Sequence, residues 1–176
     1  MGAWPQAQPF ASLQPQGPRG FGPEHDLDSA PGTIGSMPAV LTSEIPAGNE
    51  LLALYDAVGW SAYTAGPERL VRAMHGSHLV LCARDAGTGE LVGLVRTVSD
   101  GQTIVYVQDI LVAPTHQRTG IGAELLDSVL QRYDAVRQLV LLTDDEPGQR
   151  AFYESRGLTE AHDMAPHPLR AFVRFV

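Results

Sequence analysis

The sequence predicts one α/β domain behind an irregular N-terminal arm. Segments with strand-like and helix-like periodicity alternate from Met37 onward. Three strand-like segments follow one another with only short polar turns between them, which indicates an antiparallel meander. The last of these strands passes through two spaced glycines directly into a helix, a feature typical of sites that hold phosphate groups.

The segment 1–36 differs from the rest of the chain. It is rich in Pro, Gly and Gln and shows no hydrophobic periodicity, so it buries too little apolar surface to offset the entropy of ordering. We expect a flexible arm here and a folded domain over 37–176. Trp4, Phe10 and Phe21 leave open that the arm docks on the domain or on a neighbouring subunit.

The first half of the domain is predicted to contain two helices and the meander. Apolar residues at helical spacing, with Asn49 as a candidate cap, indicate the first helix, and Pro67 and Gly76 bracket the second. In chain order we expect a strand over 39–45, helices over 48–58 and 67–76 with a loop between them, and strands over 78–84, 91–98 and 103–112.

The second half is predicted to alternate between helix and strand. Pro147 opens and Gly157 closes its second helix. In chain order we expect a helix over 120–133, a strand over 138–143, a helix over 147–157 and a last strand over 171–176. A further short strand near Leu158 stays open, so the sheet is expected to have about six to seven strands, with about four helices.

Composition limits the classes of function. The net charge of −8 argues against a nucleic-acid partner. A single cysteine, Cys82, excludes a disulfide framework and a multi-thiolate metal site, and the histidines lack metal-ligand spacing, so we expect no metal. No apolar run approaches the ~18 residues of a membrane span. We therefore expect a cytoplasmic protein with no membrane partner.

The strand-to-helix turn reads Gln117-Arg118-Thr119-Gly120-Ile121-Gly122. The first amides of a helix have no partner in the chain and carry partial positive charge, and glycine lets a phosphate approach them. A nucleoside-triphosphate loop would need a lysine, and the chain has none. A dinucleotide site would need a third glycine where Leu125 stands. A pyrophosphate-binding turn of another kind remains.

Two stretches resemble a known superfamily. "DILVAPTHQRTGIGAELL", over 109–126, is similar to the main CoA-binding motif of the GNAT N-acetyltransferases, and "AFYESRGL", over 151–158, is similar to their later motif. The resemblance covers about residues 38–176. It implies the GNAT fold, with a mixed central sheet that is splayed at the cofactor site. "LYDAVGWSAYT" further resembles a small bacterial subgroup whose acceptor is unassigned.

The resemblance implies acetyl-CoA as the co-substrate. The backbone of Ile110, Leu111 and Val112 would bind the pantetheine arm as another strand would. The turn would hold the pyrophosphate through the residues Gln117, Arg118, Thr119, Gly120, Ile121, Gly122 and Ala123. The family usually has Asn and Ala where Glu146 and Gln149 stand here, and Gln149 is a candidate substitute for the missing Asn contact.

The resemblance also implies catalytic roles. Tyr153 is the candidate acid that protonates the departing CoA thiolate, and the alternative is an aromatic side chain that packs into the core. Asp109 is a candidate base for the attacking amine, with Asp144, Asp145 or ordered water as alternatives. Asp109 can instead anchor the splayed strand by hydrogen bonds, and the sequence does not decide between these roles.

The loop between the first two helices carries the candidate acceptor site. Trp60 and Tyr63 lie there, where this fold usually builds the acceptor pocket. They suit an apolar or aromatic amine, or a cation stacked on a ring. Trp60 can equally cover the core.

These observations predict an acyltransferase that moves an acetyl group from acetyl-CoA to a primary amine of a small molecule within a ternary complex. A CoA-binding regulatory module without catalysis and a protein N-acetyltransferase are the alternatives. We expect a monomer or a homodimer.

Overall fold

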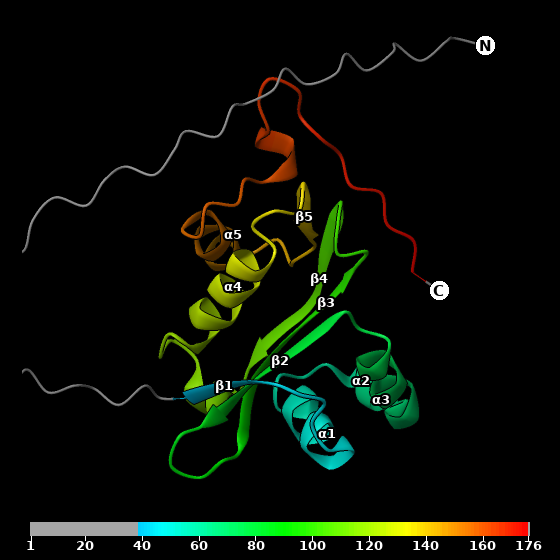
Figure 1. Cartoon of the computed structure of the whole chain (residues 1–176), viewed down its shortest axis with the longest axis vertical. Helices are drawn as coiled ribbons and strands as arrows, with labels where there is room; N and C mark the ends of the chain where they lie inside the picture. The colour runs from blue at the N-terminus through cyan, green and yellow to red at the C-terminus, as the bar shows by residue number, and fades with distance from the viewer. Residues whose placement is uncertain (1–38, 176) are drawn as a thin grey trace, which may run out of the picture. The chain divides into compact units, whose positions relative to one another are not determined.

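The computed structural model describes residues 39–175, which form a mixed sheet with helices on both faces (Figure 1). The first four strands pair antiparallel, and the fifth joins the fourth in parallel. In order across the sheet they are β1 (Ala39–Ser43), β2 (Leu79–Asp85), β3 (Leu91–Ser99), β4 (Ile104–Val112) and β5 (Gln138–Leu141). The predicted α/β fold with a mixed sheet is therefore confirmed.

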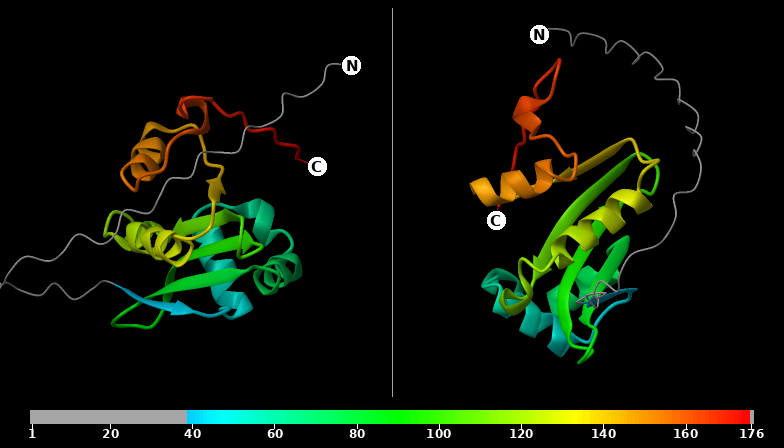
Figure 2. Two further views of the ribbon diagram at one scale, coloured as in Figure 1. Left: turned by 45° about the horizontal axis from the view of Figure 1, so that its top comes forward. Right: turned by 90° about the vertical axis from the view of Figure 1, so that its left-hand side faces the viewer.

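The helices divide between the two faces of the sheet. Three of them, α1 (Gly48–Ala57), α2 (Ser61–Thr64) and α3 (Pro67–His75), lie on one face, and α4 (Ile121–Arg132) lies on the other (Figure 2). Between β4 and α4 comes a short 3-10 turn, Pro114–His116, and α5 (Pro147–Glu154) follows β5. A second 3-10 turn, Ala161–Asp163, follows α5.

Each face of the sheet has its own apolar core, because successive side chains of a strand point to opposite faces. Leu94 and Leu111 join the core under α1 and α3, whereas Val95 and Ile110 pack into the core under α4. The strands β3 and β4 are therefore covered on both sides.

The structure departs from the sequence prediction in three places. The described residues contain five strands, because the segment predicted as a last strand pairs with nothing as far as Phe175, and Phe172 and Phe175 are each 91% exposed. The predicted loop between the first two long helices contains α2. The N-cap of α1 is Ala47 instead of Asn49. The predicted arm, 1–36, lies outside the described residues.

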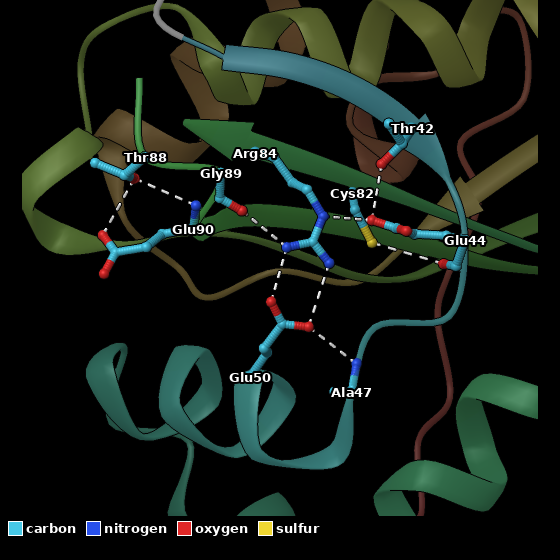
Figure 3. A network of polar contacts seen from close by, with 9 residues as sticks. All are labelled: Thr42, Glu44, Ala47, Glu50, Cys82, Arg84, Thr88, Gly89 and Glu90. Atoms are coloured by element: carbon cyan, nitrogen blue, oxygen red, sulfur yellow. Dashed lines mark hydrogen bonds and ion pairs between the residues drawn. The ribbon is translucent and has the colours of Figure 1, made fainter. Parts of the chain in front are cut away.

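Arg84 on β2 fastens the start of α1 to the sheet (Figure 3). Its Nε donates to Glu44 at 2.6 Å, and its Nη1 donates to Glu50 at 2.7 Å and to the carbonyl of Gly89 at 2.9 Å. The Glu50 carboxylate also accepts the Ala47 amide at 3.0 Å, which caps α1. This network holds the first turn of α1 against β2, next to the end of β1.

From the same network we predict how the free energy of unfolding depends on pH. Hydrogen bonds from Arg84 lower the pKa of Glu44 and Glu50 below the usual 4.5. Both carboxyls therefore bind protons less readily in the folded than in the unfolded chain, so their stabilising effect is complete above pH 4.5 and lost as the pH falls below it. Arg84→Gln should lower the free energy of unfolding more near pH 6 than near pH 3, as urea titrations at both pH values would measure.

Arg72→Gln is the matched control, because it breaks an exposed pair in which Arg72 and Glu68 lie 3.5 Å apart. It should change little at either pH. An effect of Arg84→Gln that is equally large at both pH values would show that the network does not act through these two carboxylates.

Candidate active site

β4 and β5 pair only along the first half of β4. The register runs from Ile104 opposite Gln138 to Val107 opposite Leu141, whereas β4 continues to Val112. Beyond Val107, the edge of β4 that faces away from β3 has no strand partner among residues 39–175. Alternate peptide groups of an antiparallel strand point away from its partner, so this edge offers free amides and carbonyls. Of the predicted residues, Ile110 and Val112 direct their peptide groups to this edge, whereas Leu111, like Ala113, directs its own toward β3.

A β-bulge interrupts β4 where the free edge begins. Asp109 lies opposite Arg96 and Val107 lies opposite Thr97, so Gln108 is the extra residue. A bulge changes the direction in which side chains leave the strand. Here Gln108 and Asp109, although adjacent, both contact the hydroxyl of Tyr63.

Asp109 is at the centre of a buried polar network. The residue is 1% exposed, and its Oδ2 accepts hydrogen bonds from Arg96 Nε and, at 2.8 Å, from the Tyr55 hydroxyl. Its Oδ1 accepts from the Tyr63 hydroxyl at 2.9 Å. Arg96 Nη1 in turn donates to Ser77 Oγ at 3.3 Å. Both carboxylate oxygens are thus engaged, which supports the anchoring role for Asp109 over the role of base.

The two tyrosines of this network act as hydrogen-bond donors. Burial, and next the negative charge of Asp109, raise the pKa of Tyr55 and of Tyr63 above the usual 10.0. Both hydroxyls therefore keep their protons at neutral pH. Tyr55, Arg96 and Ser77 were not predicted as site residues; the available signal was a single arginine within the apolar strand "LVGLVRTV".

Three aromatic rings form a wall beside this network. Trp60 stacks on Tyr63 with ring centroids 5.7 Å apart and an interplanar angle of 28°. Tyr55 lies behind both, 5.8 Å from Trp60 and 5.2 Å from Tyr63. The predicted acceptor residues Trp60 and Tyr63 are therefore in contact, both half-buried.

The turn between β4 and α4 leaves a run of amides unpaired. Gly120 has a φ of 98° and Arg118 a φ of 62°, both in the left-handed region. Within the described chain, no acceptor is present for the amides over 118–123, and the first helical bond runs from Glu124 N to Gly120 O at 3.0 Å. No atom lies within 4 Å of a Cβ built on Gly120. This open turn at a helix N-terminus suits an anion.

Side chains within the turn stabilise the turn itself. Gln117 Nε2 donates to the Val112 carbonyl at 3.1 Å, and Thr119 Oγ1 donates to the His116 carbonyl at 2.6 Å. The backbone is therefore what this segment offers to a ligand, together with the exposed Arg118 side chain. The remaining predicted turn residues begin α4, where Ile121 is buried and Gly122 and Ala123 are half-buried.

The later motif lies beside this turn. A Cβ built on Gly122 would be 3.7 Å from Val112 Cγ2 and 3.9 Å from Phe152 Cζ, so α5 approaches the start of α4 next to the end of β4. The Tyr153 ring meets Phe152 edge-on at 5.0 Å. Tyr153 is 9% exposed, and burial raises the pKa of its phenol, partly opposed by the Thr143 side chain.

The two positions that depart from the family pattern lie at the start of α5. Glu146 is the exposed N-cap residue of this helix and makes no side-chain capping bond. Gln149 is half-buried in the first turn. Its side chain has no hydrogen-bond partner among the described residues, which leaves it free to contact a ligand.

Among residues 39–175, no group of three or more His, Cys, Asp or Glu side chains could hold a metal ion. None of the helices over the same residues is both long enough and apolar enough to cross a bilayer.

A family model and solved structures match this chain. The model described as an acetyltransferase (GNAT) domain matches residues 46–165. The GNAT family acetyltransferase SP0256 from Streptococcus pneumoniae TIGR4 is 30% identical, with a TM-score of 0.64 over 78% of this chain and 99% of that chain. The GNAT family N-acetyltransferase YhbS from Escherichia coli, solved in complex with CoA, is 23% identical, with a TM-score of 0.56 over 78% of this chain and 74% of that chain. At that identity, YhbS shows the fold alone.

Curated relatives match over shorter stretches. The uncharacterized N-acetyltransferase ycf52-like of Prochlorococcus marinus is 31% identical over 114 residues, which are 62% of this chain and 61% of the relative. A protein of Gibberella zeae, FG08082, named as a candidate acetyltransferase, is 40% identical over 60 residues, or 32% of this chain. The matches span 34% of that relative's length and 61% of the Prochlorococcus protein's.

From the buried network we predict that loss of the Asp109 charge strongly lowers the stability of the fold. Asp109→Asn removes the counter-charge of the buried Arg96 and should lower the free energy of unfolding by about 3–5 kcal/mol, the cost of an uncompensated buried charge. Asp127→Asn, which breaks an exposed pair with Arg156 at 3.1 Å, should cost less than about 1 kcal/mol. Denaturant titration of both variants measures the contrast. Equal small losses would mean that the Arg96–Asp109 pair does not anchor β4.

Proposed function

The chain belongs to the GNAT acetyltransferase family, and from this we propose that it transfers an acetyl group from acetyl-CoA to a primary amine of a small molecule. The observation that carries the proposal is the free edge of β4 next to a turn with six consecutive unpaired amides. A ligand that fits both must combine a pyrophosphate with an arm able to hydrogen-bond like a strand. Acetyl-CoA has both parts.

The cofactor would lie across the end of β4. Its pyrophosphate would accept hydrogen bonds from the amides over 118–123, with the exposed Arg118 guanidinium as a further donor. Its pantetheine arm would pair with the backbone of Ile110, Leu111 and Val112. Gln149 would supply the contact that the family usually takes from an asparagine. The CoA complex of YhbS, which has a similar fold, supports this assignment.

The transfer would proceed by direct attack within a ternary complex. The amine nitrogen forms a bond to the thioester carbonyl carbon, the C–S bond breaks, and the departing sulfur takes a proton. A backbone amide near Leu111 or Val112 would stabilise the intermediate oxyanion. Tyr153 would donate the proton to sulfur, and its raised pKa keeps the phenol protonated at neutral pH.

The proton lost by the amine needs another acceptor than Asp109. Both oxygens of Asp109 already accept hydrogen bonds, and Arg96 neutralises its charge. Asp144 and Asp145 follow β5 and are exposed, so either of them or ordered water is the better candidate. Asp109 would then contribute to catalysis by positioning.

A second candidate function is CoA binding without catalysis. The observation in its favour is the replacement of the usual Asn and Ala before the tyrosine by Glu146 and Gln149. The two candidates share the cofactor site and differ in turnover. Release of the CoA thiol in the presence of a panel of amines separates them, and a peptide in the same panel tests a protein acceptor.

Cofactor binding is tested at the turn. Gly120→Val should abolish acetyl-CoA binding in calorimetry, because it adds a branched side chain at the open centre of the cradle and forces a φ that valine avoids. Gly89→Val is the matched control: Gly89 has a φ of 75° and open surroundings but lies in the turn between β2 and β3. It should keep the affinity of the unaltered protein. Arg118→Ala should weaken binding by about 1–3 kcal/mol. Unchanged affinity in Gly120→Val would overturn the cofactor site.

The role of Tyr153 as the proton donor to the CoA sulfur is tested by Tyr153→Phe. This change removes only the hydroxyl, so acetyl-CoA affinity and folding should persist while kcat falls by roughly 10²–10⁴, the usual contribution of a positioned acid. Steady-state kinetics with an amine taken from the panel measures it. Wild-type turnover with the chemical step limiting would assign the proton to water or to another group.

A further inference from the structure

We infer that Arg96 and Asp109 form a buried latch that holds the segment from Trp60 to Thr64 against the bulge in β4 and so sets the acceptor side of the site. This segment is called the aromatic segment below. The latch is a feature of the fold, whereas its effect on the acceptor rests on the proposed acetyl transfer. Asp109 and Arg96 are positioning residues in this scheme, because they act through Tyr63.

The aromatic segment is short and lies between α1 and α3, and its first amide, Trp60 N, donates to the Tyr55 carbonyl at 3.0 Å. Its helix, α2, has four residues, and none of them is fully buried. A helix of one turn is unstable by itself, since nucleation fixes several dihedral angles for very few hydrogen bonds. The backbone joins the segment to the helices, whereas its polar contact with the sheet is made by the Tyr63 hydroxyl.

The Tyr63 hydroxyl makes the polar contact between the segment and β4. It donates to Asp109 Oδ1 at 2.9 Å and accepts from Gln108 Nε2 at 3.2 Å. Two adjacent residues of a regular strand would point to opposite faces, so this pair of contacts requires the bulge. The Tyr63 hydroxyl therefore binds β4 at its bulge, which is also where the free edge begins.

Arg96 determines where the Asp109 carboxylate points. Arg96 Nε and the Tyr55 hydroxyl both bind Oδ2, which leaves Oδ1 for Tyr63. Ser77 lies two residues past α3, where its Oγ donates to the Ala73 carbonyl and accepts a hydrogen bond from Arg96 Nη1. The network therefore connects α1, α3 and the aromatic segment to one carboxylate on β4.

The position of the Trp60 ring depends on that of Tyr63, because the two rings are stacked. The two centroids are 5.7 Å apart, and Tyr55 supports both rings from behind. A displacement of Tyr63 would move the Trp60 indole and the wall that faces the acceptor. An amine with an apolar or aromatic body suits this wall, because the hydroxyls of Tyr55 and Tyr63 are already paired with Asp109.

The test compares two tyrosine hydroxyls in a protein with one tryptophan. Trp4→Phe leaves Trp60 as the single tryptophan. In that background, Tyr63→Phe removes the latch contact. Tyr133→Phe is the matched control, because its hydroxyl also makes two contacts, to His78 Nδ1 at 2.6 Å and to Thr97 Oγ1 at 2.9 Å. Tyr133 lies in the core under α4, on the other face of the sheet.

Acrylamide quenching of Trp60 fluorescence is the first readout. Loss of a hydrogen bond to a charged group changes a local equilibrium by about 10- to 100-fold, so Tyr63→Phe should raise the quenching constant clearly. Tyr133→Phe should leave it at the value of the background protein. An unchanged quenching constant in Tyr63→Phe would overturn the latch.

Steady-state kinetics is the second readout. In Tyr63→Phe, the acceptor KM should rise by about tenfold, while the acetyl-CoA KM and kcat stay within about two-fold. Equal changes in all three parameters would contradict an effect confined to the acceptor side. If Tyr63→Phe alters quenching but the unaltered protein acetylates no amine, the proposed function fails and the latch stands. If the unaltered protein acetylates and quenching does not change, the latch fails alone.

Discussion

The separation of β4 from β5 beyond Val107 is the constraint on which the rest of the site depends. β3 continues to pair with β4 as far as Val112, so the strand stays ordered while its other edge is left open. Unpaired peptide groups on an ordered strand can hydrogen-bond an extended ligand without a cost in ordering the protein. The turn of free amides follows within a few residues, which places a strand-like surface and an anion site side by side.

The bulge at Gln108 lies where the free edge of β4 begins and beside the face of β4 that carries the Asp109 network. The edge beyond it has no strand partner among the described residues, whereas the face carrying Asp109 is closed by Arg96, Tyr55 and Tyr63. A buried ion pair is costly in desolvation, and here hydrogen bonds to both carboxylate oxygens offset part of that cost. The network ties α1, the residues after α3 and the aromatic segment to one carboxylate on the sheet.

The sequence predicted those parts of the site whose signal is local. The glycine turn was found because spacing, a missing lysine and unpaired helix amides all lie within one short stretch. The sequence did not predict the Asp109 network, because the partners of Asp109 lie 13, 46 and 54 positions away in the chain and no local pattern connects them. The predicted last strand has a suitable composition, yet strand formation depends on a partner edge that composition does not specify. The predicted cofactor role of the glycine turn and the predicted roles of Tyr153, Gln149, Trp60 and Tyr63 remain predictions.

Backbone amide resonances followed during an acetyl-CoA titration give the most direct view of the open edge and its turn. In ¹⁵N-labelled protein, we expect the largest shifts for the amides over 118–123 and for those of Ile110 and Val112 on the free β4 edge, because these groups gain acceptors that the described residues do not supply. Amides of β1, at the far edge of the sheet, should hardly move. Saturable shifts that spare the turn and the free edge, and appear elsewhere on the sheet, would contradict the assignment of this edge to the cofactor.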